Sequence, residues 1–116
     1  MGDHNDTGKK GEDLAVNFLE GNGFHIVRRN YTFRRCEIDI IAQRDNWLLF
    51  VEVKTRSSLE FGHPEEFVDA EKAARIMRAA EEFIYSCNWH GHIRFDIISV
   101  LMGPKTKIDH FEDAIN

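Results

Sequence analysis

Apolar and polar positions recur along this chain with two different periods, which predicts helices and strands within one domain. In residues 7–22 the apolar side chains return every three or four positions, as on one face of a helix, and a Gly-Asn-Gly stretch marks the end. A second helix with the same period is predicted for residues 69–86, with Asp69 as its N-cap. The segment 1–6 is polar and unpatterned, and we expect it to be disordered.

Runs of β-branched and aromatic residues predict four strands. The second and third form a hairpin around a polar turn, and the fourth follows the second helix. These runs cover residues 24–30, 37–43, 47–55 and 93–102. Residues 107–115 add a short edge strand or a turn, whereas residues 57–66 have no period and predict a mobile loop. The order helix, three strands, helix and one or two strands predicts a single α/β domain over residues 7–116.

Four ionisable residues stand inside the predicted hairpin, where apolar residues would be expected. They are Glu37, Asp39, Glu52 and Lys54. Because side chains alternate along a strand, Glu37 and Asp39 should share one face, and Glu52 and Lys54 should share a face of the next strand. Pairing of the two strands would bring Asp39 near Glu52. The sequence therefore predicts that carboxylates and an ammonium converge on one side of the sheet.

The same alternation predicts where the apolar side chains of these strands lie. Ile38 and Ile40 should share the face opposite the charges in the second strand. In the third strand Leu49 and Val51 should lie opposite Phe50. Each strand would then be apolar on one face throughout.

Glu12 adds a charge from the first helix. At about 100° per residue it falls within the apolar stripe that should face the sheet. A carboxylate in that position needs a partner. The charged cluster of the sheet is the candidate.

Oxygen ligands of high charge suit a hard divalent cation, Mg²⁺ or Mn²⁺. Such an ion can activate water and stabilise the charge that builds on a phosphodiester, and a neighbouring lysine can assist. The competing interpretation is structural: Lys54 would pair with Glu52 or Asp39 in a buried ion network. Three acids and one lysine from three separate elements favour the catalytic interpretation.

The overall charge gives mixed signals about partners. The formal net charge is −5, which does not favour a nucleic-acid binder. However, residues 27–35, "VRRNYTFRR", hold four arginines and two aromatics without an acid, so they can contact phosphate or form a solvated strand edge. Lys72, Arg75 and Arg78 on the second helix form a rival basic surface.

Other chain-wide features narrow the class of protein. No apolar run is long enough to cross a membrane, and the first ten residues lack a signal-peptide core, so we expect a cytoplasmic protein. Cys36 and Cys87, the two cysteines, are expected to be free thiols. Cys87 with His90 and His92 could form a zinc site, but a fourth ligand is not evident and a loop with scattered histidines is the commoner case.

The motifs also resemble a known family. Asp39 followed by Glu52-x-Lys54 resembles the D…(D/E)xK signature of the restriction-endonuclease-like nuclease fold. The whole chain is similar to the YraN-like family of predicted endonucleases, which are likened to archaeal Holliday junction resolvases. The matching stretches are "GKKGEDLA", "EIDIIA", "FVEVKTR", the "FG-P" loop, Lys72 with Arg75, and "RFDIISV", from about residue 8 to residue 100. The family often has Gly where this chain has Cys36.

The resemblance implies a mixed central sheet flanked by helices and a D-ExK site that binds Mg²⁺ or Mn²⁺. It implies metal ligation by Asp39, Glu52 and the helix-borne Glu12, with Lys54 as the catalytic lysine and Glu37 beside them. The residues expected to contact nucleic acid are Arg28, Arg29, Arg34, Arg35, Arg56, Lys72 and Arg75.

Two functions from different classes follow from these observations. The first is a metal-dependent endonuclease that hydrolyses phosphodiester bonds in structured or branched DNA. The second is a nucleic-acid-binding or assembly module that has the nuclease-like fold with little or no turnover. The acidic net charge favours the second, and the intact Asp39, Glu52 and Lys54 favour the first. A homodimer is left open.

Overall fold

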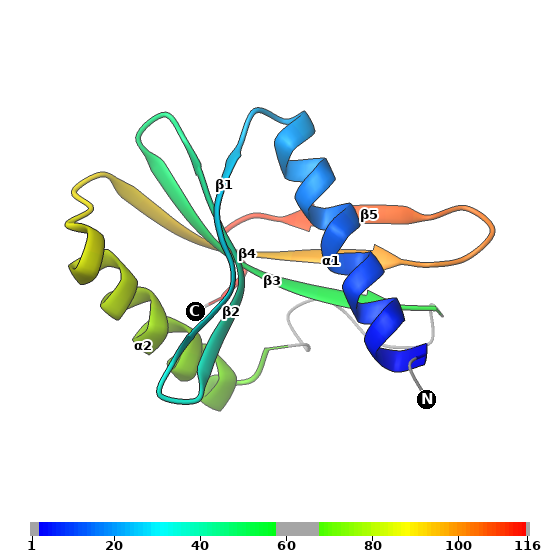
Figure 1. Ribbon diagram of the computed structural model, residues 1–116, viewed down its shortest axis with the longest axis horizontal. Coiled ribbons are helices and arrows are strands. Elements are labelled where there is room, and N and C mark those ends of the chain that lie inside the picture. The colour runs from blue at the N-terminus through cyan, green and yellow to red at the C-terminus, as the bar shows by residue number, and fades with distance from the viewer. Residues whose placement is uncertain (1–2, 58–67, 116) are drawn as a thin grey trace.

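The protein folds as a five-stranded mixed sheet with one helix on each side (Figure 1). The structure is a computed structural model that describes residues 3–57 and 68–115, with the backbone alone for residues 3–7. The elements are α1 (Asp3–Gly21), β1 (His25–Phe33), β2 (Cys36–Arg44), β3 (Trp47–Arg56), α2 (Ala70–Cys87), β4 (His92–Leu101) and β5 (Lys107–Phe111). None of the described helices is long and apolar enough to span a membrane.

The predicted class and element order are confirmed, and the differences lie at the ends of elements. Helix α1 begins at Asp3, so residues 3–6, expected to be disordered, are helical. Strand β1 runs to Phe33, three residues beyond the predicted strand, and β5 settles the last element as a strand. Residues 58–66 of the predicted loop lie outside the described residues.

The sheet has the order β1-β2-β3-β4-β5. Consecutive strands are antiparallel except β3 and β4, which are parallel. A parallel pair needs a long crossover connection, and α2 is part of it. Asp69 caps α2 as predicted: its carboxylate accepts a hydrogen bond of 2.8 Å from the backbone N–H of Lys72.

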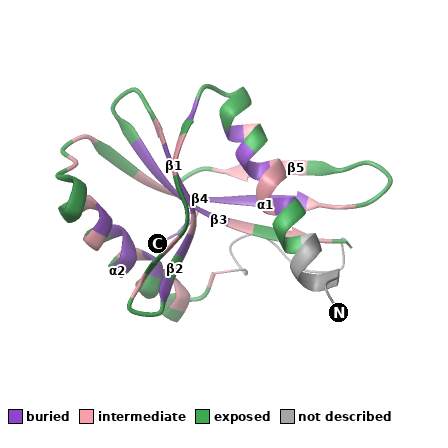
Figure 2. Cartoon of the chain, viewed as in Figure 1, coloured by how far each residue is buried: buried purple, intermediate pink, exposed green. Residues whose placement is uncertain are grey.

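Two hydrophobic cores lie on opposite faces of the sheet, one under each helix (Figure 2). The α2 core gathers alanines and larger residues of the helix, such as Ile76 and Phe83, around Phe50 of β3. The α1 core packs Ala15 and Leu19 of the helix against the other sheet face. Leu49, Val51 and Val53 of β3 belong to the α1 core, whereas Leu48 and Phe50 belong to the α2 core, so the alternation predicted for this strand is confirmed.

Helix α1 lies close against β3 at Gly11. A Cβ atom at this position would overlap the side chain of Thr55. Glycine therefore sets the distance between helix and sheet. Because Glu12 follows directly, this contact also fixes where its side chain leaves the helix.

We predict opposite effects for two glycine substitutions in α1. Gly8→Ala, at a position with open space around it, should stabilise the fold by about 0.5–1 kcal/mol through helix propensity. Gly11→Ala should destabilise it by about 1–3 kcal/mol because the added methyl group overlaps Thr55. Urea unfolding of both variants measures the two effects. A stabilised Gly11→Ala variant would show that the close contact does not constrain the helix.

Candidate active site

The site lies where β2 and β3 separate. Their pairing runs from Arg44 and Trp47 to Ile40 and Val51 and ends there. Beyond this point β2 stays paired with β1 and β3 stays paired with β4. The backbone N–H of Val53 faces the resulting gap and donates a hydrogen bond of 2.8 Å to Oδ2 of Asp39. A side chain thus replaces the missing partner strand at the fork.

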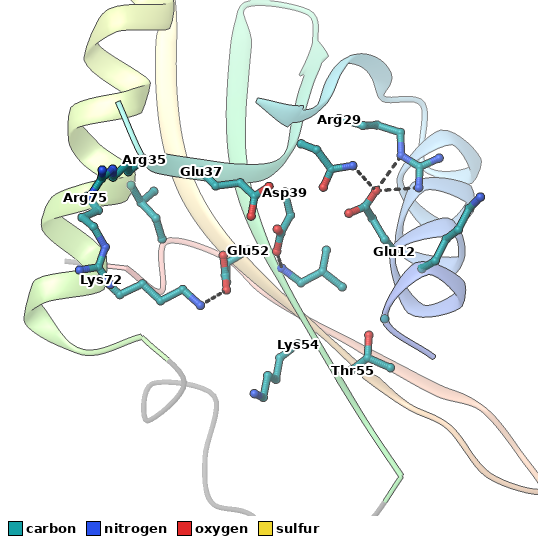
Figure 3. A pocket seen from close by; sticks show the side chains of 15 residues that line it. Glu12, Arg29, Arg35, Glu37, Asp39, Glu52, Lys54, Thr55, Lys72 and Arg75 are labelled. Carbon is teal, nitrogen blue, oxygen red and sulfur yellow. Dashed lines mark hydrogen bonds and ion pairs between the residues drawn. The ribbon is translucent and has the colours of Figure 1, made fainter. Parts of the chain in front are cut away.

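Asp39 also marks a change of face in β2. Ile38 packs in the α2 core but Ile40 packs in the α1 core, so the prediction that these two residues share a face is wrong. The physical reason is in β1: Asn30, which stands across from Asp39 between paired residues, has a left-handed backbone with φ 53°. In β1, Arg29 contacts Glu12 of α1 while Tyr31 packs in the α2 core, so this strand changes face at the same step, and the Asp39 side chain points into the gap (Figure 3).

A cleft of about 890 Å³ opens at the fork and is lined by α1, β1, β2, β3 and α2. It collects most of the residues that the sequence indicated (Figure 3). The acids predicted to form the site all line it, and so do Lys54 and four of the seven predicted nucleic-acid contacts. These residues are Glu12, Glu37, Asp39, Glu52, Lys54, Arg29, Arg35, Lys72 and Arg75. Arg28, Arg34 and Arg56 are not among the lining residues.

Asp39 and Glu52 form the electrostatic centre of the cleft. Burial and the neighbouring charge of Glu52 raise the pKa of Asp39 to about 7, with smaller contributions from Glu37 and Glu12. The hydrogen bond from Val53 acts in the opposite direction but does not compensate. Two carboxylates are therefore held close together at a cost, which is typical of functional sites.

Glu52 is buried, and its ion-pair partner is Lys72 of α2. This partner was missed: the sequence suggested Lys54 for the structural pairing and assigned Lys72 to nucleic acid. The signal was available, because Lys72 lies one helical turn before the buried Ile76 and therefore on the side of α2 that meets β3. Lys54 is exposed and lines the cleft two residues beyond Glu52.

Glu12 reaches the cleft but is engaged by β1. Its carboxylate accepts a charge-assisted hydrogen bond of 2.7 Å from Arg29 and a bond of 3.1 Å from the amide of Asn30. Arg29 also pairs with Asp13 at 2.6 Å. The expectation that the charged cluster of the sheet would supply the partner of Glu12 is therefore corrected: an arginine of the neighbouring strand supplies it.

Basic side chains stand on the α2 side of the cleft. Arg35, at the tip of the β1–β2 hairpin, lies beside Arg75 and Lys72 of α2 (Figure 3). Arg75 also pairs with Glu71 one turn earlier, at 3.3 Å. Arg34 and Arg35 both have left-handed backbones, with φ 50° and 68°. Glycine or asparagine is the usual residue at such positions.

Within the described ranges, no group of three or more His, Cys, Asp or Glu side chains is placed to hold a metal ion by itself. Cys87, His90 and His92 are thus not gathered into a zinc site; His92 stacks on Trp47 instead. The donor set of the cleft fits Mg²⁺ or Mn²⁺ better, since these ions commonly use one or two carboxylates and complete their coordination with water and phosphate oxygens. Asp39 and Glu52 supply such a pair.

A second charged cluster was not foreseen from the sequence. Asp96 of β4 is fully buried on the α1 side and accepts hydrogen bonds from Arg94, His110 and the backbone N–H of Asp113. Burial alone would raise the pKa of Asp96, but the bonds from His110 and Arg94 hold it below its ordinary value. Each of these partners satisfies the carboxylate, so the cluster ties β5 and the C-terminal turn to the sheet.

Comparison with known proteins identifies the family. Residues 11–100 match the model described as "Uncharacterised protein family UPF0102". A UPF0102 protein of Flavobacterium psychrophilum is 51% identical over 115 residues, which cover 98% of this chain and 97% of the relative. A UPF0102 protein of Dictyoglomus thermophilum is 45% identical over 112 residues, covering 96% and 95%. The chain belongs to the UPF0102 family.

The raised pKa of Asp39 predicts a pH-dependent stability. The carboxyl group has a pKa of about 7 in the folded protein against an ordinary value of 3.8, so the folded state binds this proton more tightly than the unfolded state. The stabilisation is complete below the ordinary pKa of 3.8 and is lost as the pH rises to about 7. In a metal chelator, Asp39→Asn should gain stability relative to the wild type between about pH 4 and pH 7, by about 1.4 kcal/mol per pH unit, and the difference should be constant above pH 7.

Urea unfolding across this pH range measures the difference. Glu20→Gln, an exposed position of α1, is the matched control and should show a constant difference from the wild type. A constant difference for Asp39→Asn as well would mean that the fold does not raise the pKa of the Asp39 carboxyl group.

Proposed function

We propose that this protein is a metal-dependent nuclease that hydrolyses phosphodiester bonds in DNA. The observation that carries the proposal is the pair Asp39 and Glu52, held side by side at the fork of β2 and β3 with Lys54 on the same cleft. This is the arrangement that the D…ExK pattern implies. The likeness to restriction-endonuclease-like enzymes and Holliday junction resolvases suggests structured or branched DNA as substrate, and it rests on motifs rather than on the family assignment.

Asp39 and Glu52 would hold Mg²⁺ or Mn²⁺, with Glu37 at the rim of the same cleft. When bound, the ion supplies Lewis-acid stabilisation of phosphate charge and a more acidic water. Glu12 keeps Arg29 and Asn30 in place beside these acids, so in the present arrangement it acts on the site through its charge and through β1. Its expected role as a direct metal ligand would require it to leave Arg29.

Lys54 would act on the reacting phosphate. It lies two residues beyond Glu52 on β3, and it is an exposed residue that lines the cleft. A cation there stabilises the negative charge that grows on the phosphate oxygens during attack by water. Arg35 and Arg75, on the α2 side, are suited to hold the neighbouring backbone phosphates. The cleft thus combines an acidic centre with a basic wall.

A second function, nucleic-acid binding or assembly without turnover, is favoured by one observation. Glu12 is bound by Arg29 and Asn30 and Glu52 is bound by Lys72, so two of the three expected metal ligands already have partners within the protein. The net charge of −5 agrees with weak binding to DNA. The two functions differ in the role of Lys54: a nuclease needs it for turnover, whereas a binding module does not.

A cleavage panel tests the proposed function. We expect the wild type to cleave at least one of single-stranded, duplex, flap and four-way DNA in Mn²⁺. Lys54→Ala should lower turnover by about 10²–10³-fold while Mn²⁺ binding, measured by calorimetry, stays within about threefold, because the lost interaction exists mainly in the transition state. Asp39→Asn should lose both metal binding and cleavage.

Lys105→Ala, an exposed lysine outside the cleft, is the control and should behave as the wild type. Metal-dependent DNA binding without cleavage of any substrate would support the binding module instead. Calorimetry that detects no binding at millimolar Mn²⁺ would contradict both the metal site and the nuclease.

The hairpin arginines provide a separate prediction. Replacing Arg34 and Arg35 together by Asn and Gly suits the left-handed backbone and should stabilise the fold by about 1 kcal/mol, or a few degrees in Tm. The same change should weaken binding to all DNA sequences alike and flatten its salt dependence. A Lys-Lys double variant keeps both charges and should retain binding. Unchanged DNA affinity in the Asn-Gly variant would exclude this turn from the phosphate contacts.

A further inference from the structure

The ion pair between Lys72 and Glu52 joins α2 to the centre of the cleft. Only 9% of the Glu52 side chain is exposed, against 40% of the Lys72 side chain. The backbone of Lys72 is held in the first turn of α2 by the Asp69 cap. From this fixed base the flexible lysine stem extends to the buried carboxylate, and Figure 3 shows its ammonium pointing at Glu52 from the α2 side.

A positive charge in this position balances the charge of Glu52, the most buried acid of the cleft. Glu52 is more buried than Asp39, and the two negative charges repel each other across the fork. A buried carboxylate without a partner is strongly unfavourable. Lys72 therefore supplies the counter-charge that holds the Glu52 side chain in place in the protein without metal.

A divalent cation on Glu52 would meet Lys72 as a competitor. Two positive charges on one carboxylate repel each other strongly in a partly buried site. The ammonium can move, because lysine has a long flexible stem and a single point charge, whereas a guanidinium would be held in a fixed fork. Arg35 and Arg75 line the same cleft as Lys72.

We infer that Lys72 is a built-in counterion of Glu52 that a divalent cation displaces when it binds. The released ammonium then joins Arg35 and Arg75 on the α2 wall, so that metal binding increases the positive charge available to a phosphate backbone. The binding of metal and the binding of nucleic acid are thereby coupled: the cation displaces Lys72 from Glu52, and the displaced ammonium becomes a contact for phosphate. This inference rests on the proposed metal site and adds the order in which its charges are exchanged.

Calorimetric titration with Mn²⁺ alone tests the competition. Lys72→Met should bind Mn²⁺ about tenfold more tightly than the wild type, because the competing charge is gone. Arg78→Met removes one charge from an exposed position of the same helix outside the cleft and should stay within about twofold of the wild type. In a chelator, Lys72→Met should melt below the wild type, and Mn²⁺ should raise its Tm by a larger interval.

A spectroscopic readout follows the displacement directly. On titration of the wild type with diamagnetic Mg²⁺, the side-chain NMR signals of Lys72, assigned from their absence in Lys72→Met, should move towards those of an exposed lysine. Signals that stay unshifted while Mg²⁺ binds would overturn the inference.

The outcomes separate this inference from the proposed function. Wild-type protein that binds no Mn²⁺ would remove the metal site and the inference with it. Wild-type binding together with unchanged or weaker binding by Lys72→Met would overturn the inference alone, since Lys72 would then support Glu52 as a ligand. If Lys72→Met does not fold, Lys72→Gln, which keeps a hydrogen-bond donor without the charge, is judged by the same criteria.

Discussion

The hydrogen bond from the backbone of Val53 to the carboxylate of Asp39 is the contact on which the site depends. At Ile40 and Val51 the β2–β3 ladder ends, and a backbone N–H facing the gap would otherwise lack a partner. Asp39 satisfies it and is thereby fixed beside Glu52. The fork can open without an unpaired donor only because an acid stands at this position. The same residue thus closes the sheet and supplies charge to the cleft.

Charge in this molecule is divided between two arrangements of opposite character. Around Asp96, an arginine, a histidine and a backbone N–H satisfy one buried carboxylate, and its pKa is held low. Around Asp39, a neighbouring carboxylate and burial act together, and the pKa is raised. The first arrangement stabilises the fold as it stands. The second stores an unfavourable interaction in a solvent-accessible cleft, where a bound cation could relieve it.

Local pattern was enough to predict the elements, and long-range contacts explain what it could not predict. Helical and strand periods located α2 and β3, and the cap at Asp69 was readable because it depends on residues close in sequence. The change of face at Asp39 could not be predicted in this way, because it depends on the backbone of Asn30 in the neighbouring strand β1. The partners of Glu12 and Glu52 come from β1 and α2, so only the packed structure could assign them.

The change of face in the β1–β2 hairpin has a consequence for how the protein unfolds. Ile40 and Ala42 of this hairpin pack in the α1 core, whereas Tyr31, Ile38 and Ile41 pack in the α2 core, so a single pair of strands is shared between both hydrophobic cores. Neither helix layer can detach without disturbing the same ladder of hydrogen bonds. The two cores are thereby linked through one pair of strands, and the buried amide protons of Ile40 and Ile41 in β2 should exchange only through global opening. The twist that aims a carboxylate into the cleft also makes the domain one cooperative unit.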